Sequence, residues 1–184
     1  MLGFWLFLLF INMANEYRTH NCGELRLSNV DEEVRLSGFV QKIRNLGKMK
    51  FIDLRDEKGI TQIVISEEAN IDIKDITKEC TINVIGNVVE RSSKNANIPT
   101  GEIEVVASDV TVLGKCKNEF PFEINNGSNQ NVREDLRLEY RFLDLRNEKI
   151  HNNIKLRSKI LKNFRDTMDE LEFTEVQTPI LANS

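Results

Sequence analysis

The sequence has few cysteines, and no two of them are spaced as metal ligands usually are. Cys22, Cys80 and Cys116 are the only three, and none forms a C-x-x-C pair with another. This spacing argues against a zinc site. An odd, scattered set of thiols is typical of reduced cysteines in the cytosol, so we expect a cytoplasmic protein.

The sequence also lacks an excess of positive charge, since 25 Lys and Arg stand against 29 Asp and Glu, a net charge of −4. Without a general basic field the chain does not capture nucleic acid indiscriminately. Any nucleic-acid binding has to come from a local surface with a shaped site. The 184 residues are 40% hydrophobic and 29% charged, which is typical of a soluble globular protein with one domain of ordinary size plus part of another.

Familiar catalytic patterns are missing as well. The sequence contains no G-x-x-x-x-G-K-[ST], G-x-G-x-x-G, H-E-x-x-H or G-x-S-x-G stretch. His20 and His151 are isolated, which favours structural or surface roles, and no pair of carboxylates is placed by periodicity into a pocket. The residues alone therefore indicate no active site.

One apolar run, residues 2–11, is too short to cross a bilayer, which takes about 20 residues. No Lys or Arg precedes it and no A-x-A-like cleavage site follows, so a signal peptide is not favoured. We interpret residues 1–16 as an over-extended start, with the natural protein beginning at or near Met13. A short hydrophobic or membrane-associated leader is the alternative, although we expect no membrane partner.

Residues 31–114 show the alternation of β-strands. We predict strands at residues 32–43, 51–55, 60–64, 81–91 and 102–113, with a short connecting helix within 67–80. Gly38 and Gly86 interrupt two of the strands and mark a bulge or tight bend. Five kinked strands in so short a segment predict a Greek-key barrel of the OB-fold type. An SH3-like barrel or a five-stranded sandwich fragment is the alternative.

The second half of the chain has a different character. Residues 115–131 are rich in Asn and predict a linker. A long helix is predicted at 148–171, followed by a short extended segment. Its apolar stripe consists of Ile154, Leu161, Phe164, Met168 and Leu171. Because such a stripe needs a partner surface, the second domain is predicted to be incomplete or to need another chain.

The predicted hairpin at residues 51–64 holds the best candidate binding site. Phe51 shares the polar face of its strand with Asp53 and Arg55, while Ile52 and Leu54 face the core. The preceding loop carries Lys42, Arg44, Lys48 and Lys50 without an acid. OB-fold barrels stack bases on aromatic side chains and contact phosphates with basic ones, and Gln62, placed opposite Phe51, offers a donor and an acceptor. A solvated basic loop beside a partly buried Phe is the alternative interpretation.

Five stretches carry a resemblance to a known family. They are "YRTHNCGELRLSNV", "GFVQKIRNLGKMKFIDLRDEKGITQIV", "PTGEIEV", "LRLEYRFLDLRN" and "FTEVQTPIL". Together they resemble the N-terminal part of a bacterial-type aspartyl-tRNA synthetase of class II. The resemblance implies an OB-fold anticodon-binding domain at 17–114, a hinge at 115–147, and at 148–184 the start of an α+β catalytic domain, consisting of the helix and strand of motif 1.

The resemblance also implies site residues. Arg44, Phe51 and Gln62 match the family's anticodon-binding arginine, its stacking aromatic and the glutamine that recognises the central uracil. Arg91, Asn95 and Glu104 match further contacts to the anticodon loop, and Pro179 matches a proline at the dimer interface. Two features depart from the family pattern: Phe39 replaces a usual tryptophan, and "QKIRN" is less basic than usual.

The implied activity is the ATP- and Mg²⁺-dependent attachment of aspartate to tRNA(Asp) by a homodimer. Motifs 2 and 3, which hold ATP, would lie beyond Ser184, so this polypeptide alone is predicted to bind neither cofactor and to charge no tRNA. Two alternatives remain. One is a stand-alone OB-fold module that binds nucleic acid, and the other is part of an asparaginyl or lysyl enzyme, against which "RTHNCGEL" argues.

Overall fold

The structure is a computed structural model that describes residues 17–69, 71–116, 120–124 and 132–178. The chain forms two compact units, which divide between residues 118 and 119. The leader predicted at residues 1–16 lies outside the described residues.

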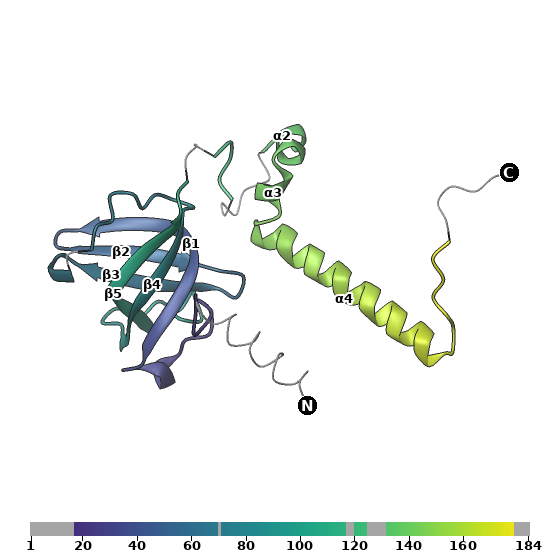
Figure 1. The fold of residues 1–184 in the computed structure, drawn as a ribbon, viewed down its shortest axis with the longest axis horizontal. Helices are drawn as coiled ribbons and strands as arrows, with labels where there is room; N and C mark the ends of the chain where they lie inside the picture. Colours follow the sequence, from purple (N-terminus) through teal and green to yellow (C-terminus); the bar gives the residue numbers. More distant parts are fainter. Residues whose placement is uncertain (1–16, 70, 117–119, 125–131, 179–184) are drawn as a thin grey trace, which may run out of the picture. The chain divides into compact units, whose positions relative to one another are not determined.

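The first unit is a closed barrel of five strands. They are β1 (Glu33–Leu46), β2 (Met49–Arg55), β3 (Ile60–Ser66), β4 (Thr81–Glu90) and β5 (Ile103–Gly114). Their order around the barrel is β1-β2-β3-β5-β4, and they curve around one interior (Figure 1). Strands β3 and β5 are parallel, whereas the other neighbours are antiparallel. This order confirms the predicted OB-fold barrel.

The barrel core is built from the inward-facing residues of these strands. Ile52 and Leu54 are fully buried, as predicted, and the alternation of β2 puts Phe51, Asp53 and Arg55 on the outer face. Strand β3 departs from this alternation, because all residues from 61 to 65 are buried. The fully buried aliphatic side chains that these strands direct into the barrel are Val34, Leu36, Val40, Ile52, Leu54, Ile63, Ile82, Val84, Val88, Ile103 and Val105.

A tight turn fixes the register of the β2–β3 hairpin. The Asp56 carboxylate accepts hydrogen bonds from the N–H groups of Lys58 at 2.7 Å and Gly59 at 3.1 Å. The Asp56 N–H donates to the carbonyl of Gly59 at 3.0 Å. Arg55 consequently pairs with Ile60, which places Phe51 opposite Val64 and Asp53 opposite Gln62.

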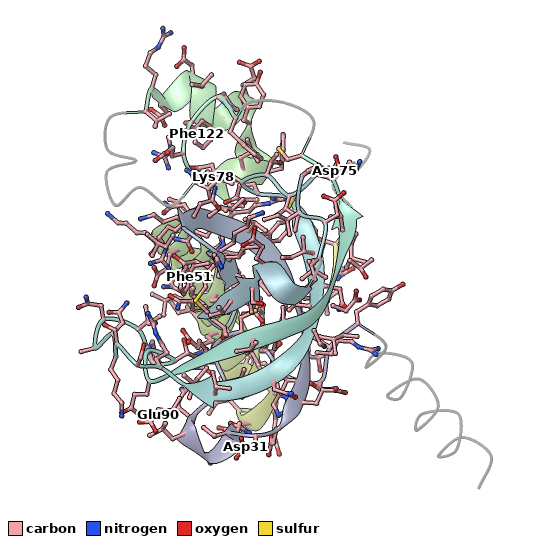
Figure 2. All side chains as sticks on the ribbon, turned by 90° about the vertical axis from the view of Figure 1, so that its left-hand side faces the viewer. Asp31, Phe51, Asp75, Lys78, Glu90 and Phe122 are labelled. Carbon is pink, nitrogen blue, oxygen red and sulfur yellow. The ribbon has the colours of Figure 1, made fainter. Side chains whose placement is uncertain are left out.

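The helix predicted within residues 67–80 is wrong: in the residues of this segment that the structure describes, only a 3-10 turn, η2 (Glu67–Ala69), forms. The Asp72 carboxylate accepts a hydrogen bond from the Lys74 N–H, which offers the backbone an alternative to a helix. Ile71, Ile73 and Ile76 also pack on the barrel core. Their spacing of two and then three residues does not place them on one face of a helix. Figure 2 labels Asp75 and Lys78 in this segment.

An N-terminal arm, residues 17–30, docks on the barrel and includes η1 (Leu27–Asn29). The Cys22 N–H donates to the second carboxylate oxygen of Asp56 at 2.7 Å, and the Cys22 carbonyl accepts from the Thr61 hydroxyl. Cys22 and Leu25 are fully buried. Burial, together with the nearby Asp56 carboxylate, raises the pKa of the Cys22 thiol. This cysteine is therefore a neutral packing residue.

The second unit contains α2 (Glu134–Glu139), α3 (Arg141–Asp144) and α4 (Glu148–Glu170). The long helix was predicted within one residue of its observed end, whereas α2 and α3 fall in a segment predicted as linker. A small core of Phe122, Ile124 and Leu143 packs there, and Figure 2 labels Phe122. The fully buried Asp144 carboxylate accepts hydrogen bonds from Arg137 and Arg141.

Helix α4 begins at a capped residue. The Asn147 side chain accepts from the N–H of Lys149 at 3.2 Å and of Ile150 at 3.4 Å, and donates to the carbonyl of Ile124 at 2.9 Å. Its predicted apolar stripe is largely exposed, with Phe164 61% accessible. Within the described ranges, no helix combines the length and hydrophobicity needed to cross a bilayer.

The two strand glycines allow close approach between backbones. A Cβ at Gly38 would lie 2.5 Å from the carbonyl oxygen of Arg55. One at Gly86 would lie 2.9 Å from the Cα of Ala107 and closer still to the Val106 carbonyl oxygen. Gly86 also lies at a register shift between β4 and β5, as predicted. Two further shifts, at Gln41 between Val40 and Lys42 and between Thr81 and Ile82, were not predicted.

We expect Gly86→Ala to lower the unfolding free energy by roughly 1–3 kcal/mol, because the added methyl group collides with backbone that cannot move freely. Urea denaturation measures the change. Gly114→Ala is the matched control, since its Cβ would lie 3.8 Å from Thr81 at ordinary contact distance. Equal stability of the two variants would contradict the assignment of Gly86 as a close-approach position.

Candidate nucleic-acid interface

Two parallel rows of side chains cross the outer face of the barrel on β2, β3 and β5. The apolar row is Phe51, Val64 and Val106, which the strand register places side by side. The polar row is Asp53, Gln62 and Glu104, each two residues along its strand from a member of the apolar row. Residues directly opposite each other share a face of a sheet, so both rows lie on the same outer surface.

The apolar row has one covered and two accessible members. Val64 is 1% exposed, Val106 is 37% exposed and Phe51 is half-buried. Phe51 is labelled in Figure 2, where the side chains of the barrel are drawn as sticks. A partly accessible ring supported by buried valine on a rigid sheet suits the stacking of a base. The expectation that Gln62 lies directly opposite Phe51 is wrong: Gln62 lies diagonally from it, which is within reach of long side chains.

Gln62 lies at the centre of a hydrogen-bonded network. Its side-chain oxygen Oε1 accepts from Nη2 of Arg44 and from Nη2 of Arg91, each at 3.0 Å. Its nitrogen Nε2 donates to Oε2 of Glu104 at 2.7 Å. Gln62 itself is only 4% exposed. The amide is thus presented at the bottom of a polar surface, with both ends held by charged partners.

The arginines of this network are neutralised by carboxylates. Nη2 of Arg44 lies 2.6 Å from Asp53, and Nε of Arg91 lies 3.9 Å from Glu104. The Arg44 guanidinium also lies 6.0 Å from the centre of the Phe51 ring, within cation–π range. Two cations and two anions around a neutral amide leave the cluster with no net charge. The attraction of phosphate groups therefore falls to other residues.

The β1–β2 hairpin carries three lysines outside this cluster. Lys42 and Lys48 are exposed and Lys50 is half-buried; Lys48 lies in the hairpin turn and Lys50 next to it, whereas Lys42 lies further along β1. Gly47 forms the turn with a φ of 62°, in the left-handed region that favours glycine. Arg44 pairs with Phe51 and Lys42 pairs with Asp53 across β1 and β2, so Lys42 shares the outer face with the ring, whereas Lys50 alternates to the other face of β2.

The structure brings five of the predicted residues into one surface and separates the sixth. Arg44, Phe51, Gln62, Arg91 and Glu104 belong to the two rows or contact them. Asn95 lies in the β4–β5 loop, where its side-chain oxygen accepts from the Asn97 N–H at 3.0 Å. Its backbone N–H donates to Gly101, so its observed contacts support the loop. Pro179 lies outside the described residues.

Sequence reasoning missed two features of the site. Asp53 was placed on the polar face without a role, although its alternation with Phe51 was the available signal. Val64 was missed because a buried residue on the outer face looks like any strand valine. Arg55 lies on the same outer face but is paired with Glu79, whose carboxylate is 3.0 Å from its Nη2. It is therefore not part of the two rows.

Comparison with known proteins agrees with this geometry. Residues 34–113 match the family of OB-fold nucleic acid binding domains, and residues 133–184 match the class II tRNA synthetases of the D, K and N group. The aspartate–tRNA ligase of Bacteroides thetaiotaomicron is 46% identical over 172 residues, covering 91% of this chain and 29% of that protein. The aspartate–tRNA(Asp/Asn) ligase of Rickettsia prowazekii is 47% identical over 175 residues, covering 92% and 28%.

A solved structure shows the same fold. The aspartyl-tRNA synthetase from Entamoeba histolytica superposes with a TM-score of 0.81 at 19% identity, covering 92% of this chain and 41% of that one. The fold and the two matched segments together define the chain as a class II aminoacyl-tRNA synthetase sequence.

Within that class, the chain belongs to the aspartate–tRNA ligase family, as the identities to its members show. The synthetase match at residues 133–184 favours this assignment over a stand-alone OB-fold module. The chain spans less than a third of the length of the curated relatives it matches.

We expect Gln62→Leu to lower the unfolding free energy by about 1–3 kcal/mol, because two guanidinium groups lose an acceptor and a carboxylate loses a donor in a mostly buried cluster. Chemical denaturation measures the change. Gln41→Leu is the matched control: within the described part of the chain, its buried Oε1 accepts no hydrogen bond. We expect the control to change stability by no more than about 0.5 kcal/mol, and similar losses in both variants would refute the network.

Proposed function

We propose that the outer face of the barrel binds the anticodon loop of tRNA(Asp), within a protein that attaches aspartate to that tRNA. The observation that supports this proposal most directly is the apolar row beside the polar row. Phe51 provides a flat surface for one unpaired base, and Gln62 lies diagonally beside it with a hydrogen-bonding edge. Single-stranded RNA is recognised by such combinations of stacking and edge contacts.

The proposed contacts are Arg44, Phe51, Gln62, Arg91 and Glu104 on the barrel, with Asn95 acting from the β4–β5 loop. The position of Asn95 supports the last assignment, since it lies in the loop that Arg91 closes through a backbone hydrogen bond to Glu102, and Arg91 itself contacts Gln62. Lys42, on the same face as Phe51, and Lys48, in the β1–β2 turn, contact phosphates.

Other parts of the proposal concern the whole protein. The family's reaction uses ATP and Mg²⁺. Among the described residues, no group of three or more His, Cys, Asp or Glu side chains is arranged to hold a metal ion. We also propose the divisions 17–114, 115–147 and 148–184, a homodimer contact at Pro179, and a cytoplasmic location. The exposed stripe of α4 supports a packing role in the remainder of such a protein.

We expect Phe51→Ala to weaken binding of an anticodon stem-loop of tRNA(Asp) by about 1–3 kcal/mol, because the base loses its stacking surface. Fluorescence anisotropy with the labelled stem-loop measures the affinity, and circular dichroism checks the fold. Phe142→Ala removes an aromatic ring that is 62% exposed in the second unit and serves as the matched control. Unchanged affinity of Phe51→Ala with an intact fold would exclude stacking at this position.

We expect Lys48→Ala to reduce the salt dependence of the same binding by about one unit of slope in log Kd against log [salt], because one phosphate contact is lost. Affinity measured across a series of salt concentrations gives the slope. Lys115→Ala is the control, since Lys115 is paired with Asp75 at 2.5 Å. A slope that stays the same in Lys48→Ala would show that the hairpin tip does not contact phosphates.

A further inference from the structure

Arg44 reaches two different groups with one nitrogen. Its Nη2 donates to Oδ1 of Asp53 at 2.6 Å and to Oε1 of Gln62 at 3.0 Å. The Arg44 side chain is 39% exposed and the Asp53 side chain 24% exposed. A long side chain that accessible has many rotamers, and holding one of them costs conformational entropy. The short contact to Asp53 favours the rotamer that places Nη2 on Gln62.

The orientation of the Gln62 amide follows from its partners. Its oxygen faces two guanidinium groups and its NH₂ group faces a carboxylate. A flipped amide would direct N–H groups at two cations and an oxygen at an anion, which converts every contact of the amide into a repulsive one. The charges around Gln62 therefore determine which end of the amide faces which neighbour.

We propose that Asp53 is a positioning residue that sets base specificity: it holds Arg44 on the oxygen of Gln62, so that both lone pairs of this oxygen are occupied and Gln62 offers a base only an N–H donor. The inference rests on the proposed anticodon binding and extends it to a residue that need not touch the RNA. Arg91 alone does not replace Arg44, because a single guanidinium leaves one lone pair of the amide oxygen free to accept from a base.

The fixed amide presents a defined edge to a base. Both lone pairs of Oε1 are occupied by the two arginines, and within the described part of the chain only one of the two N–H groups of Nε2 donates a hydrogen bond. A base next to Phe51 consequently meets a single N–H donor from Gln62. The donor-and-acceptor pair expected from the sequence is available only if Arg44 leaves. Loss of Asp53 therefore broadens the set of bases that Gln62 accepts.

The test uses the full chain and RNA hairpins in which each loop position carries each of the four bases in turn. At the loop position where wild-type protein discriminates most strongly, we expect Asp53→Ala to reduce the ratio between the best and worst base about fivefold. Asp53→Asn, which keeps an acceptor for Arg44 without the charge, should give an intermediate ratio. The salt dependence of binding should rise in Asp53→Ala, because the released Arg44 becomes available to phosphates.

Asp109→Ala removes an exposed carboxylate of β5 outside the cluster and controls for general electrostatics, so its discrimination should equal that of wild type. A second measurement needs no RNA. In the free protein, the NMR order parameter of the Gln62 side-chain NH₂ group should approach the rigid value of about 0.85 and fall below about 0.6 in Asp53→Ala.

The outcomes separate the two proposals. Discrimination and amide order that are unchanged in Asp53→Ala overturn the inference and leave anticodon binding intact. Wild-type protein that binds every hairpin equally overturns anticodon recognition and the inference with it. Reduced discrimination with equal loss in Asp109→Ala assigns the effect to surface charge and also overturns the role of Asp53.

Discussion

The hydrogen bonds of a single carboxylate determine which residues of this barrel face outward. Asp56 binds the N–H groups of Lys58 and Gly59 in the turn, and the N–H of Cys22 in the N-terminal arm. Because side chains alternate along a strand, a slip of one residue in the β2–β3 register would exchange the two faces of β3 relative to β2. The core and the recognition surface therefore depend on the same turn, and the docked arm holds that turn from outside the hairpin.

The recognition surface is neutral and internally satisfied before any ligand arrives. Each ionised group of the polar row has a partner of opposite charge, and the central amide is bound at both ends. Because these charges are already paired, the surface attracts phosphate groups only weakly. A base that binds there has to match the few hydrogen-bond donors that are still unused. Under the proposed function, affinity and specificity are divided between two places: the lysine hairpin attracts the RNA backbone, and the rows on β2, β3 and β5 select the base.

The sequence predicted what depends on local periodicity. The five strands, the burial of Ile52 and Leu54, the outward position of Phe51 and the long helix all follow from spacings of two or of three to four residues. The network around Gln62 was beyond such reasoning, because its members come together only when the barrel closes: Gln62 contacts Arg91 and Glu104, which are 29 and 42 positions away. The helix expected at 67–80 failed for a related reason: its isoleucines pack on the barrel core, and that contact exists only once the barrel has closed.

The two units differ in how completely they bury their own apolar surface. The barrel encloses its aliphatic side chains almost fully, so its outer face is held rigidly by a finished core. Helix α4 leaves Ile154, Leu161 and Phe164 of its apolar stripe 45–61% exposed in the described part of the chain, and a helix with such a stripe gains most of its stability from packing. The proposed anticodon-binding surface is thus formed and supported by the barrel alone. The contribution of α4, in contrast, depends on whatever surface it packs against.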